Sequence, residues 1–196
     1  MRRREIAGVL VGVAIMAFAG CGEDDGGPVS APSFDAVLPS GWSEGDDDDL
    51  ESIEETAVQG AASAIGVSSD DLVLEAEAVW FDSETGGSFA TNVNVLAEEL
   101  PAGFDEGDYV DASLGNLEGL PGIEDFERGP GPDLGGDKTE EVEYSSSAGT
   151  GPVRFRALTV VRGETGFTVT LAAAEEDFGE ASADLDEIAA SWEWTD

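Results

Sequence analysis

The sequence predicts an α+β domain, an antiparallel β-sheet flanked by helices, over residues 34–196. The first observation is a pair of alternating segments, 153–161 and 167–173, joined by a short turn at 162–165. This pattern is typical of a β-hairpin. The second is the apolar spacing of three and four residues between 178 and 191, which predicts a closing amphipathic helix. Further alternating segments earlier in the chain supply more strands for the sheet.

The first 21 residues, MRRREIAGVLVGVAIMAFAGC, predict a lipoprotein signal peptide over residues 1–20. Three arginines precede an uncharged apolar run at 6–19, which is the layout of an export signal. Ala19-Gly20-Cys21 resembles a lipobox, and Cys21 is the only cysteine of the chain. An uncleaved membrane span needs about 20 apolar residues, more than this run provides. An ordinary cleaved signal with an incidental cysteine is the remaining alternative.

Cys21 is the predicted site of lipid attachment. A diacylglyceryl group on its thiol and an acyl chain such as palmitate on the freed amine would hold the protein on the cell membrane, on its extracytoplasmic face. Two chains give stable anchoring, whereas one gives marginal binding. Residues 21–33 are rich in Gly, Pro and acidic residues, and they predict a flexible tether.

The charge balance is extreme, with 8 Lys and Arg against 44 Asp and Glu. It excludes nucleic acid as a partner, because nucleic-acid binding requires a basic surface. An acidic surface of this kind is also typical of proteins adapted to high salt, where screening removes the self-repulsion. On that interpretation, the melting temperature of the purified protein falls as salt is lowered.

The first half of the domain predicts two helices and three strands. A strand at 34–38 ends in a turn, and Trp42 follows as a core plug. Apolar residues at helical spacing predict a helix over 50–65, headed by Asp46–Asp49. A strand at 73–81 has one face inward, consisting of Leu74, Ala76, Ala78 and Trp80, and another strand covers 89–96. A helix is expected at 108–117.

The second half predicts a short strand at Ile123 and Phe126, and then a Gly- and Pro-rich loop at 129–136. A polar strand at 139–145 is expected at or near a sheet edge. The hairpin and the closing helix follow. Trp192 and Trp194 are expected to seal the edge of the core.

Two charged clusters are candidate sites. Asp46–Asp49 could bind a cation weakly, but the EF-hand spacing fails, and a solvated helix cap is the favoured interpretation. Arg154 and Arg156 share one strand face and could bind an anion, although ion pairs with neighbouring acids are favoured. No metal site, cofactor or catalytic residue is predicted.

The missing residue types restrict the chemistry. The chain has no histidine, and its one thiol is expected to be acylated. Histidine-based triads, cysteine nucleophiles and cysteine zinc sites are therefore excluded. Paired carboxylates, as in glycosidases, remain, but any chain this acidic offers such pairs.

Several segments resemble the PsbP/Mog1-like fold, in particular bacterial lipoproteins of the LpqN/DcrB type. The resemblance is carried by FDAVLPSGW at 34–42, NVNV at 92–95, the strand at 153–161, GFTVTL at 166–171, and the segment from Phe178 to Trp192. It implies an antiparallel sheet in an α/β/α sandwich and a non-enzymatic accessory or binding role. No functional residue is carried over.

The expected function is that of a lipid-anchored cell-envelope lipoprotein, a binding or accessory module and not an enzyme. Its expected partners are the membrane, through lipid on Cys21, and an envelope protein or a small ligand. A cation-binding or salt-adapted acidic surface protein is the alternative. A carboxylate-dependent envelope hydrolase ranks last.

Overall fold

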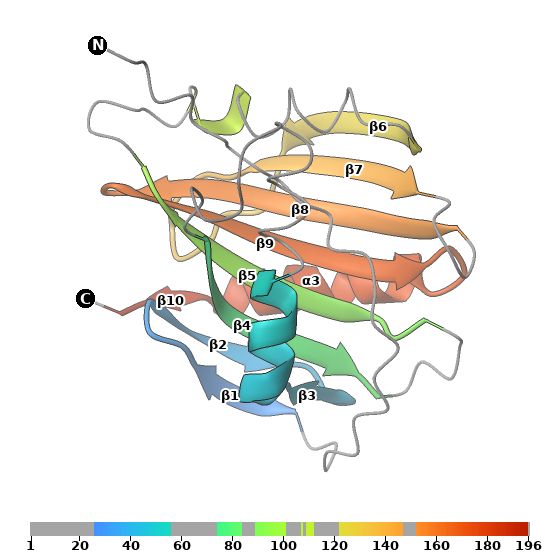
Figure 1. Cartoon of the computed structure of the whole chain (residues 1–196), viewed down its shortest axis with the longest axis horizontal. Helices are drawn as coiled ribbons and strands as arrows, with labels where there is room; N and C mark the ends of the chain where they lie inside the picture. Colours follow the sequence, from blue (N-terminus) through green and yellow to red (C-terminus); the bar gives the residue numbers. More distant parts are fainter. Residues whose placement is uncertain are drawn as a thin grey trace.

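The computed structural model describes residues 26–55, 74–83, 89–100, 107, 109–111, 122–146 and 152–195. Two antiparallel sheets form this part of the molecule. The larger has seven strands in the order β3-β4-β5-β9-β8-β7-β6, and the smaller has the order β1-β2-β10 (Figure 1). The helix α3, Phe178–Ser191, lies behind the larger sheet, and a helical segment at 47–55 lies in front of it. The predicted α+β class is therefore confirmed.

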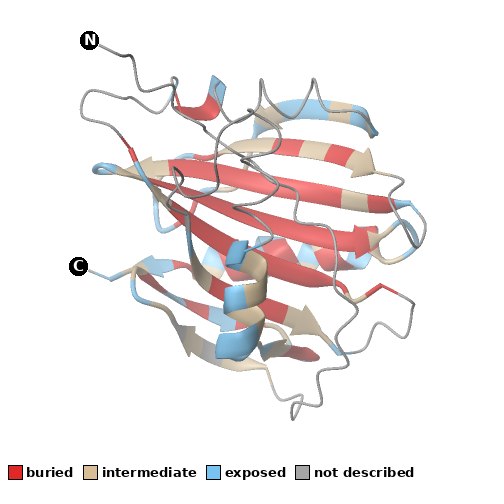
Figure 2. Cartoon of the chain, viewed as in Figure 1, coloured by how far each residue is buried: buried red, intermediate tan, exposed pale blue. Residues whose placement is uncertain are grey.

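The larger sheet is built around the predicted hairpin. Its two strands are β8, Val153–Arg162, and β9, Thr165–Ala174, paired in register from Val153↔Ala174 to Arg162↔Thr165. The strand β5, Asn92–Glu99, pairs along the other side of β9. These three central strands are buried along nearly all of their length (Figure 2).

Shorter or more exposed strands complete the two sides of this sheet. On one side lie β4, Leu74–Asp82, and β3, Trp42–Glu44. On the other lie β7, Glu140–Ser146, and the outermost strand β6, Ile123–Pro130. The polar strand β7 is second from the edge, as its sequence predicted.

The smaller sheet corrects the predicted tether. The strand β1, Gly27–Ser30, pairs with β2, Phe34–Leu38, which also pairs with β10, Glu193–Trp194. Val29 and Ala31 pack against the core. The prediction of a free tether up to residue 33 is wrong from Gly27 onward, because the valine in this polar stretch gives the segment something to bury.

The main core lies between α3 and the larger sheet. Leu185 and Ile188 of α3 are 0% exposed, together with Phe34, Val93, Val169 and Leu171 from the strands. Trp42 is buried as predicted, and its indole N–H donates to Asp184 at 2.9 Å. Trp192 stacks on Phe34 with ring centroids 3.8 Å apart, and the Trp194 N–H donates to the Leu134 carbonyl. These two tryptophans close the core edge as expected.

Three element predictions need correction. The prediction that β4 has one face inward is too simple, because Val79, on the face opposite Ala78 and Trp80, is also buried at 1% exposed. A register shift between Ala76 and Ala78 also breaks the simple alternation. The strand expected at 89–96 begins at Asn92, and the loop expected at 129–136 begins only after Pro130 and contains the fully buried Leu134.

Two of the predicted helices are described only in part. Helical residues are seen at 47–55 and at 107 and 109–111, and the rest of both segments lies outside the described residues. Among the helices that the structure describes, none has the length and apolar character needed to cross a membrane.

Candidate functional site

The candidate site is a group of polar side chains buried on the sheet face that points away from α3. Its members, named here the polar patch, are Asn94 on β5, Thr168 and Thr170 on β9, and Thr159 on β8. Asn94 pairs with Thr170, and Thr168 pairs with Thr159. Directly paired residues of antiparallel strands point to the same face, with Cβ atoms about 5 Å apart. The four side chains therefore form one continuous surface across three central strands.

Alternation along the strands places these residues on that face. Val93 and Val95 on β5, and Val169 and Leu171 on β9, pack into the core beneath α3. Successive side chains of a strand point to opposite faces, so the residues between them must point the other way. A shift of one residue would place the polar set under α3 and move the valines to the opposite face.

The patch is buried, and most of its polar atoms lack hydrogen-bond partners. Asn94 and Thr159 are 0% exposed, and Thr170 is 1% exposed. Within the described part of the chain, the Asn94 Nδ2 and Oδ1 atoms and the hydroxyls of Thr159 and Thr170 have no hydrogen-bond partner. Such a buried unsatisfied group costs about 1–3 kcal/mol. Residues kept at this cost in a sheet centre call for an explanation.

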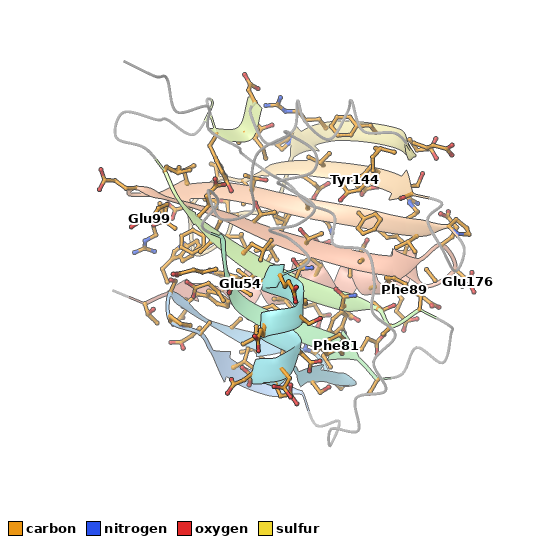
Figure 3. All side chains as sticks on the ribbon, viewed as in Figure 1. Glu54, Phe81, Phe89, Glu99, Tyr144 and Glu176 are labelled. Carbon is orange, nitrogen blue, oxygen red and sulfur yellow. The ribbon has the colours of Figure 1, made fainter. Side chains whose placement is uncertain are left out.

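Aromatic side chains border the patch on two sides. The Tyr109 hydroxyl lies 3.3 Å from the Thr168 hydroxyl, and its ring lies on Gly166, where an added Cβ would sit 2.5 Å from the ring carbon Cζ. On the other side, Tyr144 stacks on Phe155 with centroids 4.8 Å apart. Tyr144 projects from β7 (Figure 3), and its buried hydroxyl also has no hydrogen-bond partner in the described ranges. Burial raises the pKa of Tyr144, so it stays neutral.

Glu98 is the second-last residue of β5 and its side chain is ionisable. It pairs with Gly166 and lies on the same sheet face as Asn94. Burial raises the pKa of its carboxyl from 4.5 to about 7, because desolvation disfavours the charged form. Its Oε2 atom makes no hydrogen bond to any residue that the structure describes. A protonated Glu98 adds a neutral donor and acceptor beside the patch.

The sequence-predicted site residues do not belong to this patch. Cys21, the predicted lipid attachment site, lies outside the described residues. Asp46 is the first residue before the helical segment, and its Oδ1 accepts bonds from the backbone N–H groups of Asp48 and Asp49 at 3.0 and 3.1 Å. The interpretation as a helix cap is confirmed. Within the described ranges, no group of three or more carboxylate or thiol side chains is placed to hold a metal ion.

The two arginines of β8 are paired, as the favoured interpretation expected. Arg154 bonds to Glu143 at 2.9 Å, and its guanidinium lies 4.1 Å from the Phe178 ring centroid. Arg156 donates to Glu141 at 2.6 Å, to Asp186 at 2.8 Å and to the Ser182 carbonyl at 2.9 Å. Four donated bonds leave Arg156 little capacity for an anion, so it links α3 to the sheet.

Sequence reasoning gave the polar patch no role. The alternation of Thr168 and Thr170 with valine and leucine is that of any half-buried strand, whose polar face normally meets water. The available signal was the asparagine pair Asn92 and Asn94, since asparagine is depleted in strands. In a sandwich with helices on both faces, neither sheet face meets water. The predicted α/β/α arrangement therefore implies that Asn92 and Asn94 are buried.

Comparison with protein-family models and with curated proteins gives no match. Solved structures do match. LpqN of Mycobacterium tuberculosis, described as involved in cell envelope biogenesis, is 13% identical with a TM-score of 0.57, over 89% of this chain and 93% of that one. The cyanobacterial PsbP (CyanoP) of Synechocystis sp. PCC 6803 is 16% identical with a TM-score of 0.55, over 92% and 99%. The Ran-binding protein Mog1p of Saccharomyces cerevisiae has a lower TM-score of 0.46 at 14% identity, over 87% and 95%. The first two likenesses show the fold, and the chain adopts the PsbP/Mog1-like fold that its sequence predicted.

Proposed function

We propose that this chain is a cell-envelope lipoprotein, anchored through lipid on Cys21 to the extracytoplasmic face of the membrane, where it acts as a non-enzymatic binding or accessory protein. The observation that carries the proposal is the single cysteine, placed directly after an apolar run that ends in Ala19-Gly20. The fold of LpqN, an envelope protein by its description, supports the same compartment. A chain without histidine also suits a binding role better than a catalytic one.

Because β1 belongs to the domain, the linker between Cys21 and the domain is short. Residues 22–25 separate Cys21 from the described domain, which begins at Gly26. Gly26 has φ +51°, and an added Cβ would clash with the Pro39 carbonyl oxygen. The chain is therefore packed against the smaller sheet from this residue onward. Five steps from Cys21 to Gly26 span at most about 18 Å, so a lipidated Cys21 would hold the β1–β2 end of the domain near the membrane.

The first experiment measures the mass of the N-terminal peptide of the protein purified from membranes of its producing cells. The proposal expects a peptide that begins at Cys21 and carries acyl chains. A peptide that retains residues 1–20, or an unmodified Cys21, would contradict it. Cys21→Ser is the matched variant, and it should be released from the membrane fraction.

A second experiment tests the short anchor. Single cysteines replace the exposed Val37 on β2 or the exposed Glu127 on β6, at the opposite end of the molecule (Figure 1). Each is labelled with a donor dye in the lipidated protein, and energy transfer to an acceptor lipid is measured. Transfer should be stronger from position 37, and equal transfer would contradict the geometry. Insertion of a Gly-Ser linker after Gly22 should remove the difference.

Partner capture tests the accessory role. Crosslinking in intact producing cells should recover specific envelope proteins with the wild type and not with Cys21→Ser. If no specific protein is recovered, the proposal of a protein partner is contradicted, and binding of a small molecule is the binding role that remains.

A further inference from the structure

The polar patch differs from every other polar cluster that the structure describes. Arg156, a buried charged residue on the α3 face, makes four hydrogen bonds. The buried indole N–H groups of Trp80 and Trp192 lack hydrogen bonds, but these rings pack edge to face with centroids 6.4 Å apart. In the patch, both polar atoms of Asn94 and two threonine hydroxyls lie buried with no partner among the residues that the structure describes.

We propose that the polar patch is a binding site for a small, uncharged molecule rich in hydroxyl or amide groups. The proposal develops the binding role proposed above and does not depend on the lipid anchor. An asparagine side chain offers two donors and two acceptor lone pairs, and each threonine hydroxyl offers one donor and two lone pairs. A ligand that both donates and accepts would match these groups, whereas an apolar ligand would leave them unsatisfied.

The charge of the surroundings favours a neutral ligand. The four patch residues carry no charge, in a chain with a formal net charge of −36. An anion would find no basic side chain in the patch, because the arginines of β8 point to the α3 face, where they pair with Glu143, Glu141 and Asp186. A cation would find one nearby carboxylate on this face of β5, that of Glu98.

The strand geometry sets the size of the ligand. The patch spans three neighbouring strands, which is about 10 Å at 4.8 Å between strands, and it extends about 7 Å along β9 from Thr168 to Thr170. The ring of Tyr109 over Gly166 and the stacked pair of Tyr144 and Phe155 border this area. Flat apolar rings beside hydroxyl and amide groups suit a compact molecule with C–H and O–H or N–H groups on different sides.

The test uses the full-length chain in detergent, isotopically labelled, with myo-inositol and propionamide as the two probes. Side-chain amide signals of Asn94 are followed by NMR as each probe is added. The proposal expects a saturable shift with at least one probe. It also expects Asn94→Leu and Thr170→Val to weaken binding at least tenfold. Thr165→Val, the same change at the first position of β9 and on its other face, should bind as the wild type does.

Two results would overturn the proposal. One is no saturable shift with either probe, and the other is binding that Asn94→Leu and Thr170→Val leave unchanged. Should Asn94→Leu fail to fold, as judged from its amide spectrum, Thr159→Val takes its place, because a threonine-to-valine change keeps the side-chain shape. The anchor is tested separately by the mass of the Cys21 peptide, so either idea can fail without the other.

Discussion

The two faces of the central sheet are built by the same strands and buried to the same degree, yet they differ in chemistry. The face under α3 carries valine, leucine and aromatic residues in contact with Leu185 and Ile188. The opposite face carries Asn94, Thr159 and Thr170 with unpartnered polar atoms. Burial alone therefore does not distinguish a structural core from a candidate binding site. What separates them is whether each buried polar atom has a partner.

Arg156 is a buried polar residue on the α3 face, and unlike most of the patch residues it has hydrogen-bond partners. Arg156 is 8% exposed, and its guanidinium makes four bonds to Glu141, Asp186 and the Ser182 carbonyl. It is enclosed by its partners, and it ties the helix to β7 and β8. We therefore assign the α3 face to stability and the polar patch to binding, and the following changes test that division.

The largest loss of stability is expected from Leu185→Ala. This side chain is 0% exposed at the centre of the α3 face. A leucine-to-alanine change in a core removes buried methyl groups and leaves a cavity, which costs about 2–5 kcal/mol. Urea unfolding followed by circular dichroism measures the change. A loss below 1 kcal/mol would mean that α3 contributes little to holding the sheet.

Arg156→Leu should come next. The change leaves Glu141 unpaired beside the sheet and removes the bond to the Ser182 carbonyl. Breaking a buried pair costs about 3–5 kcal/mol, and the partial exposure of Asp186 reduces this to about 2 kcal/mol. Arg156→Lys keeps the charge but loses the planar guanidinium, which bonds to several partners at once. Its unfolding free energy should therefore lie between those of the wild type and Arg156→Leu. Equal unfolding free energies of the Lys and Leu variants would contradict a contribution of the positive charge at position 156.

Gly166→Ala probes the border of the polar patch. The new Cβ would sit 2.5 Å from the Tyr109 ring, which must move. Overpacking of this kind costs about 1–3 kcal/mol. In a Tyr109→Ala background the same glycine change should cost far less, because the clashing ring is gone. Additive costs in the double mutant would show that the ring does not rest on Gly166.

Glu98, on the patch side of the sheet, should make the stability of the folded protein depend on pH. Its pKa is raised by burial to about 7 in the folded protein, against 4.5 for the ordinary carboxyl. The folded state therefore binds the proton more tightly. This contribution to stability is complete below about pH 4.5 and is lost as the pH rises through about 7.

Glu98→Gln isolates this contribution from the other carboxylates. The difference in unfolding free energy between wild type and variant should change between pH 4.5 and 7, by at most about 3 kcal/mol. Below and above this window the difference should be flat. A difference that stays constant throughout would mean that Glu98 titrates normally.

Much of the fold followed from the sequence, because its signals were local. The hairpin from 153 to 174 and α3 at Phe178–Ser191 were predicted nearly to the residue from alternation and helical spacing. The strand β1 was missed, since Gly27–Ser30 becomes a strand only by pairing with β2. The shift in β4 and the later start of β5 also depend on the partner strand.

The candidate site was not predicted, for a related reason. Asn94 and Thr170 are 76 positions apart along the chain and become neighbours through the pairing of β5 with β9. Whether a polar strand face meets water depends on what covers it, and no single strand carries that information. The sequence did indicate that Arg154 and Arg156 form ion pairs with acids, because acidic residues are abundant throughout the chain, and it indicated the cap at Asp46, whose partners Asp48 and Asp49 are adjacent in sequence.

The division between the two faces is tested most directly by one matched pair of variants. Thr170→Val and Val169→Thr are opposite, isosteric changes at adjacent positions of β9, one on each face. Removing an unsatisfied hydroxyl from the polar patch should raise the unfolding free energy of the ligand-free protein by up to about 1 kcal/mol. Adding one under α3 should lower it by about 1–3 kcal/mol. Urea unfolding that shows opposite signs would support the account, and a loss of stability in Thr170→Val would contradict it.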